Sequence, residues 1–301
     1  MAPRKLVAEI GGRTLALSNL DKVLYPETGF TKGEVIDYYV RIAPVLLTHL
    51  GDRGITFRRF PNGVDGQSFF EKRCPSHRPE WVQTALGPGD SGGAIDYCRL
   101  AEVASLAWAA NLAALELHAP MARGEDIESP TMVVYDLDPG APAAMTECAE
   151  IGLLIRDVLA GIGLSCYAKT SGSKGLQVYL PLNAPHSHDH ASSFALAVAQ
   201  ALEKAQPDLV VTTQAKAART GKVLIDWSQN SRHKTTICVY SLRARPRPTV
   251  STPVTWDEVA AAADGSPLTF EAADVLQRVE ELGDLFEPTL TEVQHLPATP
   301  S

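Results

Sequence analysis

Two aspartates lie close together at the end of an apolar stretch, in the sequence TMVVYDLDPG of residues 131–140. Side chains alternate between the two faces of a strand, so Asp136 and Asp138 project the same way. Neighbouring carboxylates raise each other's pKa unless a positive charge lies between them. A divalent cation that prefers oxygen ligands, Mg²⁺ or Mn²⁺, would supply that charge. The pair therefore predicts a metal site, and the alternative interpretation is a solvated strand end followed by a turn.

A third aspartate ends another apolar stretch, in GKVLIDWSQN of residues 221–230. Three acids on neighbouring strand ends suit two-metal phosphoryl transfer, in which one ion serves the attacking oxygen and one the leaving group. Taken alone, Asp226 is better explained as a cap of the turn that follows it. Together with Asp136 and Asp138, it predicts a shared metal centre.

The segment KTSGSKGLQVYLPL of residues 169–182 combines glycines, hydroxyls and a lysine between two strand-like stretches. Such a loop can surround phosphate oxygens with its N–H groups, while Ser171 and Lys174 add a hydroxyl and a charge. The spacing is not that of a Walker loop, and a plain tight turn remains the alternative. His118, in LELHAP, follows a predicted buried helix, where a lone histidine is more often structural than catalytic.

Charge is unevenly distributed along the 301 residues, whose net charge of −8 argues against a general nucleic-acid binder. Residues 53–78 carry six Lys or Arg against two acids, and residues 216–247 carry eight against one. Residues 256–295 reverse this balance, with ten acids and one arginine. Basic charge is therefore localised, as a groove for a polyanion requires, although solvated basic loops would give the same pattern.

Periodicity and turn signals predict strands that alternate with helices, and hairpins that make the sheets mixed. Thr31 and Glu34 have the spacing of a capping box for a helix that ends near residue 50. A buried helix is expected over 99–117. The other expected helices cover 146–161, 190–205 and parts of an acidic tail after 256; the expected strands lie near 6–18, 55–60, 67–72, 94–100, 131–139, 164–172, 175–182, 221–228 and 235–242. The fold class is α/β, with mixed parallel and antiparallel sheets flanked by helices, in a single domain over 1–301.

Five scattered cysteines without a C-x-x-C pair are expected to be buried, reduced thiols. The sequence has no apolar run of membrane-spanning length and no basic-then-apolar leader. We therefore expect a cytoplasmic protein with no membrane partner.

Several motifs together resemble one known family. VVYDLDPG, TSGSKGLQVYLPL, GKVLIDWSQN, KTTICVYSLR and the N-terminal DKVLYP are similar to segments of the polymerase domain of bacterial ligase D. This is the non-homologous end-joining branch of the archaeo-eukaryotic primase superfamily, and the resemblance runs from about Leu15 to about Trp256. It implies a primase-polymerase fold.

The resemblance also implies an activity. Such proteins are template-dependent nucleotidyltransferases that extend DNA ends or fill gaps in break or gap repair, often with ribonucleotides and often with manganese. The reaction is attack of a primer 3′-hydroxyl on an NTP or dNTP at a two-metal Mn²⁺ or Mg²⁺ site. By the resemblance, Asp136, Asp138 and Asp226 are the catalytic metal ligands; His118, Ser171, Lys174, Arg219 and Arg243 bind the nucleotide; Lys22, Lys32, Arg58, Arg59, Phe69 and Phe70 bind DNA. Phe69 and Phe70 would stack on the template, and Lys22 and Lys32 would hold a downstream 5′-phosphate.

Partners follow from the same resemblance: DNA with gaps or ends, particularly with a 5′-phosphate, a Ku-type end-binding protein, and a location at the nucleoid. The sequence contains no K-x-D-G motif, so we expect a separate DNA ligase to seal the product. The segment of residues 119–135 is shorter than in ligase D domains, which leaves end bridging and overhang preference open. A metal-dependent nuclease and a non-catalytic end-binding protein are the alternative functions.

Overall fold

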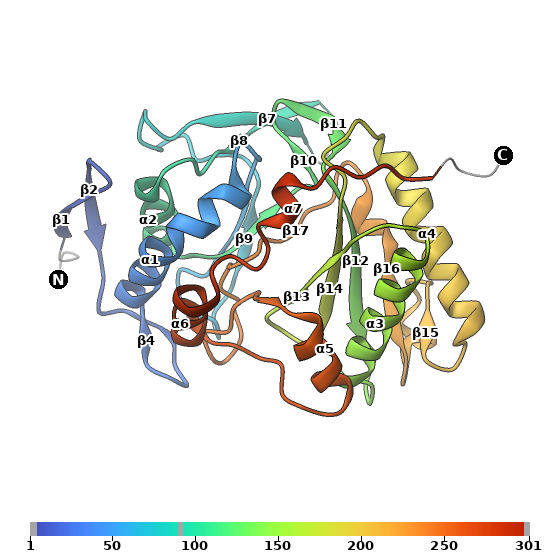
Figure 1. Ribbon diagram of the computed structural model, residues 1–301. Coiled ribbons are helices and arrows are strands. Elements are labelled where there is room, and N and C mark those ends of the chain that lie inside the picture. The colour runs from blue at the N-terminus through green and yellow to red at the C-terminus, as the bar shows by residue number, and fades with distance from the viewer. Residues whose placement is uncertain (1–4, 90–92, 298–301) are drawn as a thin grey trace. The chain divides into compact units, whose positions relative to one another are not determined.

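The computed structural model describes residues 5–89 and 93–297 (Figure 1). Its contacts divide the chain into two compact units, each assembled from three separate stretches. The first unit comprises Met1–Glu125, Ile237–Ser251 and Phe270–Gly283; the second comprises Asp126–Thr236, Thr252–Thr269 and Asp284–Ser301. Because neither unit is one continuous stretch, no linker marks them in the sequence, and the single domain over 1–301 stays a prediction.

The first unit contains a four-stranded sheet, three hairpins and three helices (Figure 1). The sheet has the order β17 (Thr236–Ile237), β9 (Ala114–Ala119), β5 (Thr56–Arg59), β6 (Phe69–Glu71). The hairpins are β1 (Lys5–Ile10) with β2 (Arg13–Ser18), β3 (Val23–Tyr25) with β4 (Phe30–Thr31), and β7 (Thr84–Pro88) with β8 (Ala94–Cys98). Helix α1 (Lys32–Leu50) packs against α2 (Val103–Asn111) and contacts α6 (Ala272–Leu282).

The start of α1 confirms the predicted capping box. The Thr31 hydroxyl oxygen accepts a hydrogen bond from the Glu34 N–H, and the Glu34 carboxylate accepts one from the Thr31 N–H at 2.7 Å. Both groups would otherwise be among the unpaired N–H donors of a helix start. The β1–β2 turn is also as predicted, because Gly11 and Gly12 both have positive φ, at 57° and 76°.

The helix predicted over 99–117 is wrong in its second half. Helix α2 ends at Asn111, and residues Ala114–Ala119 form β9 instead. Ala113 between them has a φ of 59°, which an α-helix does not tolerate. The first four residues of β9 are buried, and an apolar run of this kind has no period that distinguishes a strand from a buried helix. His118 therefore lies on an inner strand and not after a helix.

The second unit is built on a six-stranded sheet. Its order is β15 (Val210–Val211), β16 (Val223–Asp226), β12 (Met132–Pro139), β14 (Leu176–Pro181), β13 (Tyr167–Thr170), β18 (Pro253–Val254). The β15–β16 pair is parallel and the others are antiparallel, which confirms the mixed α/β fold class. The remaining described elements of this unit are helices α3 (Met145–Gly161), α4 (His188–Ala205), α5 (Trp256–Ala263) and α7 (Pro288–Thr291), 3-10 turns at Lys216–Arg219 and Trp227–Asn230, and the short strand β11 (Asp126–Pro130). The short strand β10 (Ala122–Arg123) belongs to the first unit.

One face of this sheet is covered by α3. A methyl group added at Gly152 of α3 would lie 2.7 Å from Leu176 and 3.8 Å from Val178 of β14. Leu176 is paired with Leu137 in the register of β12, so Leu137 points to the α3 side. Side chains alternate along a strand, and the even-numbered residues of β12, including Asp136, therefore point to the opposite face.

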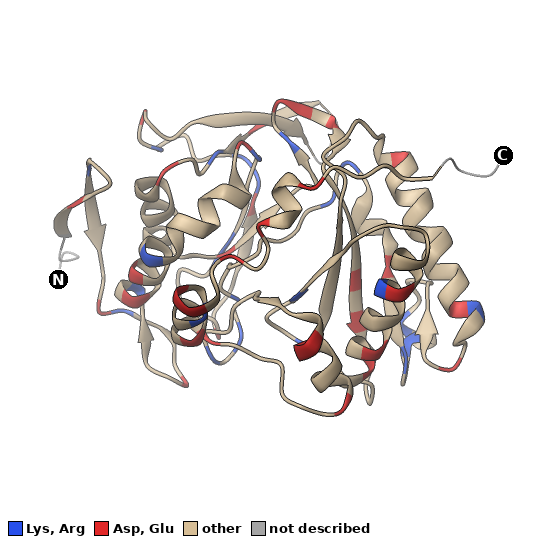
Figure 2. Cartoon of the chain, in the orientation of Figure 1, with Lys and Arg blue, Asp and Glu red and all other residues tan. Residues whose placement is uncertain are grey.

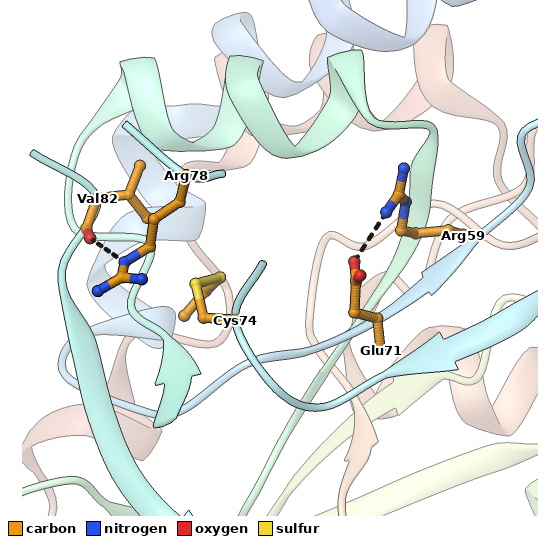
Figure 3. The surroundings of a disulfide bond; sticks show 6 residues. Arg59, Glu71, Cys74, Arg78 and Val82 are labelled. Carbon is orange, nitrogen blue, oxygen red and sulfur yellow. Dashed lines mark hydrogen bonds and ion pairs between the residues drawn. A yellow bond between two sulfur atoms is a disulfide. The ribbon is translucent and has the colours of Figure 1, made fainter. Parts of the chain in front are cut away.

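The cysteines differ in part from the expectation. Cys74, which follows β6, and Cys98, which ends β8, form a disulfide (Figure 3). The Cys74 N–H donates to the Asp96 carbonyl at 2.7 Å, which brings the loop against β8 although the cysteines are 24 residues apart. Cys148, Cys166 and Cys238 are buried free thiols, as predicted. Sequence spacing alone could not identify the pair, because the pairing depends on how β6 and β8 are placed.

The acidic C-terminal region forms three short helices, α5, α6 and α7, and Asp and Glu recur along it (Figure 2). On α6, Asp274, Glu280 and Glu281 are exposed while Val275 is fully buried. The acidic tail is thus partly helical, as predicted, and these three acids of α6 face solvent. No helix among the described residues is both long and apolar enough to pass through a bilayer.

Candidate active site

The three predicted metal ligands lie on adjacent strands of the second unit. Asp136 of β12 stands directly opposite Asp226 of β16 in the antiparallel register. Directly opposite residues have Cβ atoms about 5 Å apart. Asp138 is two residues further along β12 and therefore on the same face as Asp136. The backbone register thus places the three positions on one face of the sheet, and their role as shared metal ligands stays a prediction.

The pKa of Asp136 is raised by burial and by its acidic neighbours. Burial raises its pKa, the charge of Asp138 raises it further, and that of Asp226 adds to both; the hydrogen bond from Gln177 and the charge of Lys169 oppose them. The net result is a pKa of about 7 for a side chain that is half-buried. Like charges packed this closely are stabilised by any cation that binds among them.

Asp226 caps the turn that follows it, and its place in the sheet also sets it opposite Asp136. Its Oδ1 accepts hydrogen bonds from the Ser228 N–H at 3.0 Å and from Gln214 Nε2 at 2.9 Å, and its Oδ2 accepts one from Gln229 Nε2 at 2.8 Å. It therefore caps the 3-10 turn that follows, as its local sequence suggests. At the same time its backbone position faces Asp136, which the turn alone does not require.

The residues fit a divalent cation by their chemistry. Three carboxylates on one sheet face supply the oxygen donors that Mg²⁺ and Mn²⁺ prefer, and the raised pKa of Asp136 shows that negative charge is concentrated there. The side chains are not gathered around one point: in residues 5–89 and 93–297, no three His, Cys, Asp or Glu are arranged to hold a metal ion. Both oxygens of Asp226 already accept hydrogen bonds from side-chain amides, Oδ1 from Gln214 and Oδ2 from Gln229 of the following turn.

A buried lysine that the sequence reading missed continues the row of Asp226 and Asp136. Lys169 of β13 is paired with Gln177 of β14, and Gln177 is paired with Asp136. The Lys169 ammonium, 1% exposed, donates to Gln177 Oε1, and Gln177 Nε2 donates to Asp136 Oδ1 at 2.9 Å. The row thus runs across four strands and brings a positive charge toward an acidic face. The sequence signal that could have identified this row is a polar residue, Lys169 or Gln177, inside each of two otherwise apolar strands.

The loop between β13 and β14 is a tight turn closed by Ser171. The Ser171 N–H donates to the Gly175 carbonyl at 2.9 Å, and the Ser171 hydroxyl oxygen accepts from the N–H groups of Ser173 and Gly175. A side chain at Gly175 would collide with the Leu137 carbonyl, so the loop lies directly against β12. These two N–H groups already have an acceptor, so they do not surround a phosphate in this conformation. Lys174 is exposed.

Arg219 is tied to the strand end that carries Asp138. The Gly140 N–H donates to the Lys222 carbonyl, and the Gly140 carbonyl accepts from the Gly221 N–H. A methyl group at Gly140 would lie 1.9 Å from the Arg219 carbonyl oxygen. The Arg219 guanidinium donates to Gln214 Oε1 at 2.7 Å, and the same amide donates to Asp226. The structure therefore brings Ser171 and Arg219 to the strands that bear the acids.

His118 and Arg243, the other predicted nucleotide ligands, lie in the first unit around a buried acid. Glu116 of β9 is 1% exposed, and its Oε2 lies 3.1 Å from His118 Nε2 while its Oε1 lies 3.1 Å from Arg243 Nε. Although burial would raise it, the hydrogen bond from His118 and the charge of Arg243 hold the pKa of Glu116 well below its usual range. Sequence reading missed Glu116 because residues 99–117 were interpreted as a helix.

The predicted DNA-binding aromatic rings are exposed, and each is backed by an arginine. Phe69 and Phe70 on β6 are 44% and 58% exposed. The Arg59 guanidinium lies 5.2 Å from the Phe69 ring centre and that of Arg58 lies 5.3 Å from the Phe70 ring centre. Arg58 is also paired with Glu116, and Arg59 with Glu71 at 3.0 Å (Figure 3). Both arginines therefore support the rings, with part of their hydrogen-bonding capacity already used.

A pocket of about 780 Å³ begins at Phe70 and is lined by residues 70–77 on one side and Gly89, Ala94 and Ile95 on the other. Its lining includes Lys72 and Arg73 from the basic stretch and Cys74 of the disulfide. Two of the six basic residues of the stretch 53–78 thus line this depression, together with Glu71, and a basic groove for a polyanion stays a prediction.

The two lysines predicted to hold a 5′-phosphate are neighbours across the β3–β4 hairpin. The Lys32 N–H donates to the Lys22 carbonyl at 2.8 Å. The Lys32 ammonium is buried and donates to the Ser18 carbonyl at 2.6 Å, while Lys22 is exposed. Burial lowers the pKa of Lys32 to about 8, and the charges of Lys22 and Arg59 contribute.

Fold and site together define a mixed α/β protein with three acids in register on one sheet face, beside a serine-closed loop and an arginine turn. Comparison with known proteins gives the family: the LigD primase-polymerase domain family matches residues 31–286. The chain therefore belongs to this family, whose members are DNA-directed nucleotidyltransferases. The resemblance drawn from the motifs is confirmed.

Solved and curated relatives agree with this assignment. The structure is similar to that of the polymerase domain of Mycobacterium tuberculosis ligase D in complex with DNA, with a TM-score of 0.87 and 43% identity over 93% of this chain and 99% of that one. The multifunctional non-homologous end joining protein LigD of Mycolicibacterium smegmatis is 46% identical over 90% of this chain, and the bifunctional LigD of Bacillus subtilis is 30% identical over 89%. The chain spans only 35% and 43% of those two relatives.

Proposed function

We propose that this protein is a template-dependent polymerase that extends DNA ends or fills gaps during break repair, with a primer 3′-hydroxyl attacking the α-phosphate of an NTP or dNTP. The observation that carries the proposal is the register that sets Asp136 opposite Asp226, with Asp138 on the same face. Phosphoryl transfer depends mainly on positioning and electrostatic stabilisation, which charged groups fixed on strands can supply.

Each residue set has a distinct role in this proposal. Asp136, Asp138 and Asp226 would hold Mn²⁺ or Mg²⁺, and the bound ions would neutralise charge on the attacking and leaving oxygens. Lys169 and Gln177 hold the Asp136 carboxylate in place through their hydrogen bonds. In the second unit, Ser171, Lys174 and Arg219 would bind the triphosphate. His118 and Arg243 of the first unit stay predicted nucleotide ligands.

DNA binding would use the exposed surface of the first unit. Phe69 and Phe70 offer ring faces for stacking on template bases, and stacking tolerates any sequence because every base has a π-face. Lys22 and Lys32 would bind the 5′-phosphate of the downstream strand. The solved relative was determined with DNA, which supports the assignment of a DNA substrate.

The relatives' names support a role in non-homologous end joining. Within that role we propose a preference for manganese and the use of ribonucleotides. We also propose a Ku-type end-binding partner, a separate DNA ligase that seals the product, and a cytoplasmic location at the nucleoid.

The decisive experiment is incubation of the purified protein with a gapped duplex, Mn²⁺ and labelled nucleotide. Extension of the primer supports the proposal, and a chelator should abolish it. Shortening of the DNA without added nucleotide would identify a nuclease instead. Binding without extension or shortening would identify an end-binding protein.

A further inference from the structure

Glu116 is an acid with no surface of its own to offer a ligand. It is 1% exposed, and both of its oxygens are occupied. Oε1 accepts from Arg243 Nε and from the Ala244 N–H, both at 3.1 Å, and Oε2 faces His118 Nε2 at 3.1 Å and Arg58 Nη1 at 3.4 Å. A carboxylate with this many donors acts by holding its neighbours, two of which are predicted nucleotide ligands.

The contact with Glu116 fixes the tautomer of His118. An ionised carboxylate only accepts hydrogen bonds, so the proton of the neutral ring must sit on Nε2. Burial lowers the pKa of His118 below its usual value despite the opposing effect of Glu116, which favours the neutral ring in the free protein. Nδ1 then carries a lone pair, which repels a phosphate oxygen. A ring that binds phosphate through Nδ1 has to gain a proton there.

The groups that face the ring determine whether it can gain this proton. Glu116, on the same strand, favours the charged ring, while Arg58 of β5 and Arg243 oppose it. The fourth neighbour, Phe70 of β6, presents a ring at 5.6 Å between centroids and carries no charge. A phosphate oxygen would add a second negative charge near the ring and shift the balance toward protonation.

Resting on the proposed function, we infer that Glu116 is a positioning residue that lets His118 bind the nucleotide's phosphate as an imidazolium, so that nucleotide binding takes up one proton. The proton comes from solvent, bonds to Nδ1 on binding and returns to solvent when the phosphate leaves. Glu116 supplies the buried counter-charge and keeps its own ionised state throughout.

The sign of the pH dependence follows. Where the free ring is neutral and the bound ring is charged, each rise of one pH unit weakens nucleotide binding by up to about tenfold, because one proton is a reactant. Glu116→Gln removes the charge that favours the imidazolium, so it weakens binding and reduces proton uptake. His118→Gln removes proton uptake altogether.

The test is titration calorimetry of the whole chain with ATP and Mn²⁺, without DNA, at pH 7.5 in buffers of different ionisation enthalpy. The dependence of the heat on the buffer gives the number of protons taken up. We expect uptake of a substantial fraction of one proton by the wild type, less by Glu116→Gln and none by His118→Gln. Glu102→Gln is the matched control, since Glu102 pairs with Arg13 in the same unit, and it should behave as the wild type.

The result that overturns the inference is ATP binding with no proton uptake, or uptake that His118→Gln leaves unchanged. Thermal unfolding shows whether each variant is folded. If Glu116→Gln does not fold, Glu116→Asp replaces it as a variant that keeps the charge. The comparison of proton uptake by the wild type and by His118→Gln still tests the inference. Failure of the proposed function is distinguishable: it appears as a wild type that neither binds ATP nor extends a primer, in which case both proposals fall.

Discussion

Asp136 and Glu116 are the same kind of group in two different electrostatic settings. Asp136, in the second unit, faces Asp226 across the sheet and has Asp138 two residues away, and its pKa is raised to about 7. Glu116, in the first unit, is more deeply buried, yet its pKa is held well below the usual range. The difference lies in the partners: three hydrogen-bonded side-chain donors surround Glu116, whereas two further acids crowd Asp136.

This contrast separates a buried charge that the protein's own donors stabilise from one that an added cation would stabilise. A buried carboxylate surrounded by donors is stable in the ionised state without any ligand, and it serves to orient its neighbours. Adjacent carboxylates oppose each other, and the row of Gln177 and Lys169 offsets this in part at Asp136. The first pattern indicates a supporting role, and the second indicates a site where an added cation is favoured.

The largest effect on activity is expected from substituting one of the three acids of the second unit. We expect Asp226→Asn to lower primer extension by about a thousandfold or more, equivalent to about 4 kcal/mol of transition-state stabilisation, because it removes a metal ligand. The amide keeps an acceptor oxygen for the turn, so the fold should persist. Rates of primer extension with Mn²⁺ measure this, alongside DNA affinity, which should change little.

Asp208→Asn is the control for this prediction, because Asp208 is an exposed acid of the same unit. It should extend primers at the wild-type rate. Normal extension by Asp226→Asn would remove the acid row from the catalytic assignment.

A smaller effect is expected from the cations beside the acids. Lys174→Ala and Arg219→Ala should each raise the KM for nucleotide, since each loses a charge-assisted phosphate contact of about 1.5–3 kcal/mol. Because Lys174 is exposed, its loss should leave the melting temperature unchanged, whereas Arg243→Ala should lower it by leaving Glu116 underpaired. Steady-state kinetics and thermal unfolding measure the two quantities. A KM unchanged in both Lys174→Ala and Arg219→Ala would exclude them from the triphosphate site, and exposed Lys204→Ala is the control.

Local signals in the sequence predicted the parts of the molecule that local physics decides. The capping box of Thr31 and Glu34 placed the start of α1, and the apolar runs that end in Asp138 and Asp226 placed β12 and β16. Alternation along β12 put Asp136 and Asp138 on one face. That Asp226 stands opposite Asp136 could not be predicted from either strand, because neither strand's sequence specifies strand order or register.

The features that the sequence did not predict depend on contacts between residues that are far apart in the chain. Ala113 breaks an apolar run that reads as one helix, and this misreading hid the pairing of Glu116 with His118 on a strand. Lys169 and Gln177 are meaningful only through cross-strand register, which single strands do not reveal. The pairing of Cys74 with Cys98 likewise required β6 and β8 to be placed first.

Changing Lys22 and Lys32 tests whether the first unit has a second cationic site. Lys22→Ala with Lys32→Ala should abolish the preference for a 5′-phosphorylated gap, a change of about tenfold or less in the ratio of extension rates. Since the pKa of Lys32 is about 8, its charge is lost as the pH rises through that value. The wild-type preference should therefore shrink between pH 7 and pH 9. An equal preference before and after the double substitution would place the phosphate site elsewhere.

The smallest effect is expected at Phe70, and it distinguishes stacking from charge. Phe70→Leu keeps an apolar side chain at an exposed position but removes the ring face, so template binding should weaken by about 1 kcal/mol, the lower end for base stacking. Because no counterion is released when a ring stacks, this loss should be the same at low and high salt, whereas the loss from the lysine pair should fade as salt rises. Fluorescence anisotropy with a labelled template at two salt concentrations measures both. If the Phe70→Leu loss also faded with salt, the ring would act through the Arg58 guanidinium beneath it, and the aromatic surface would belong to the cationic cluster around Glu116.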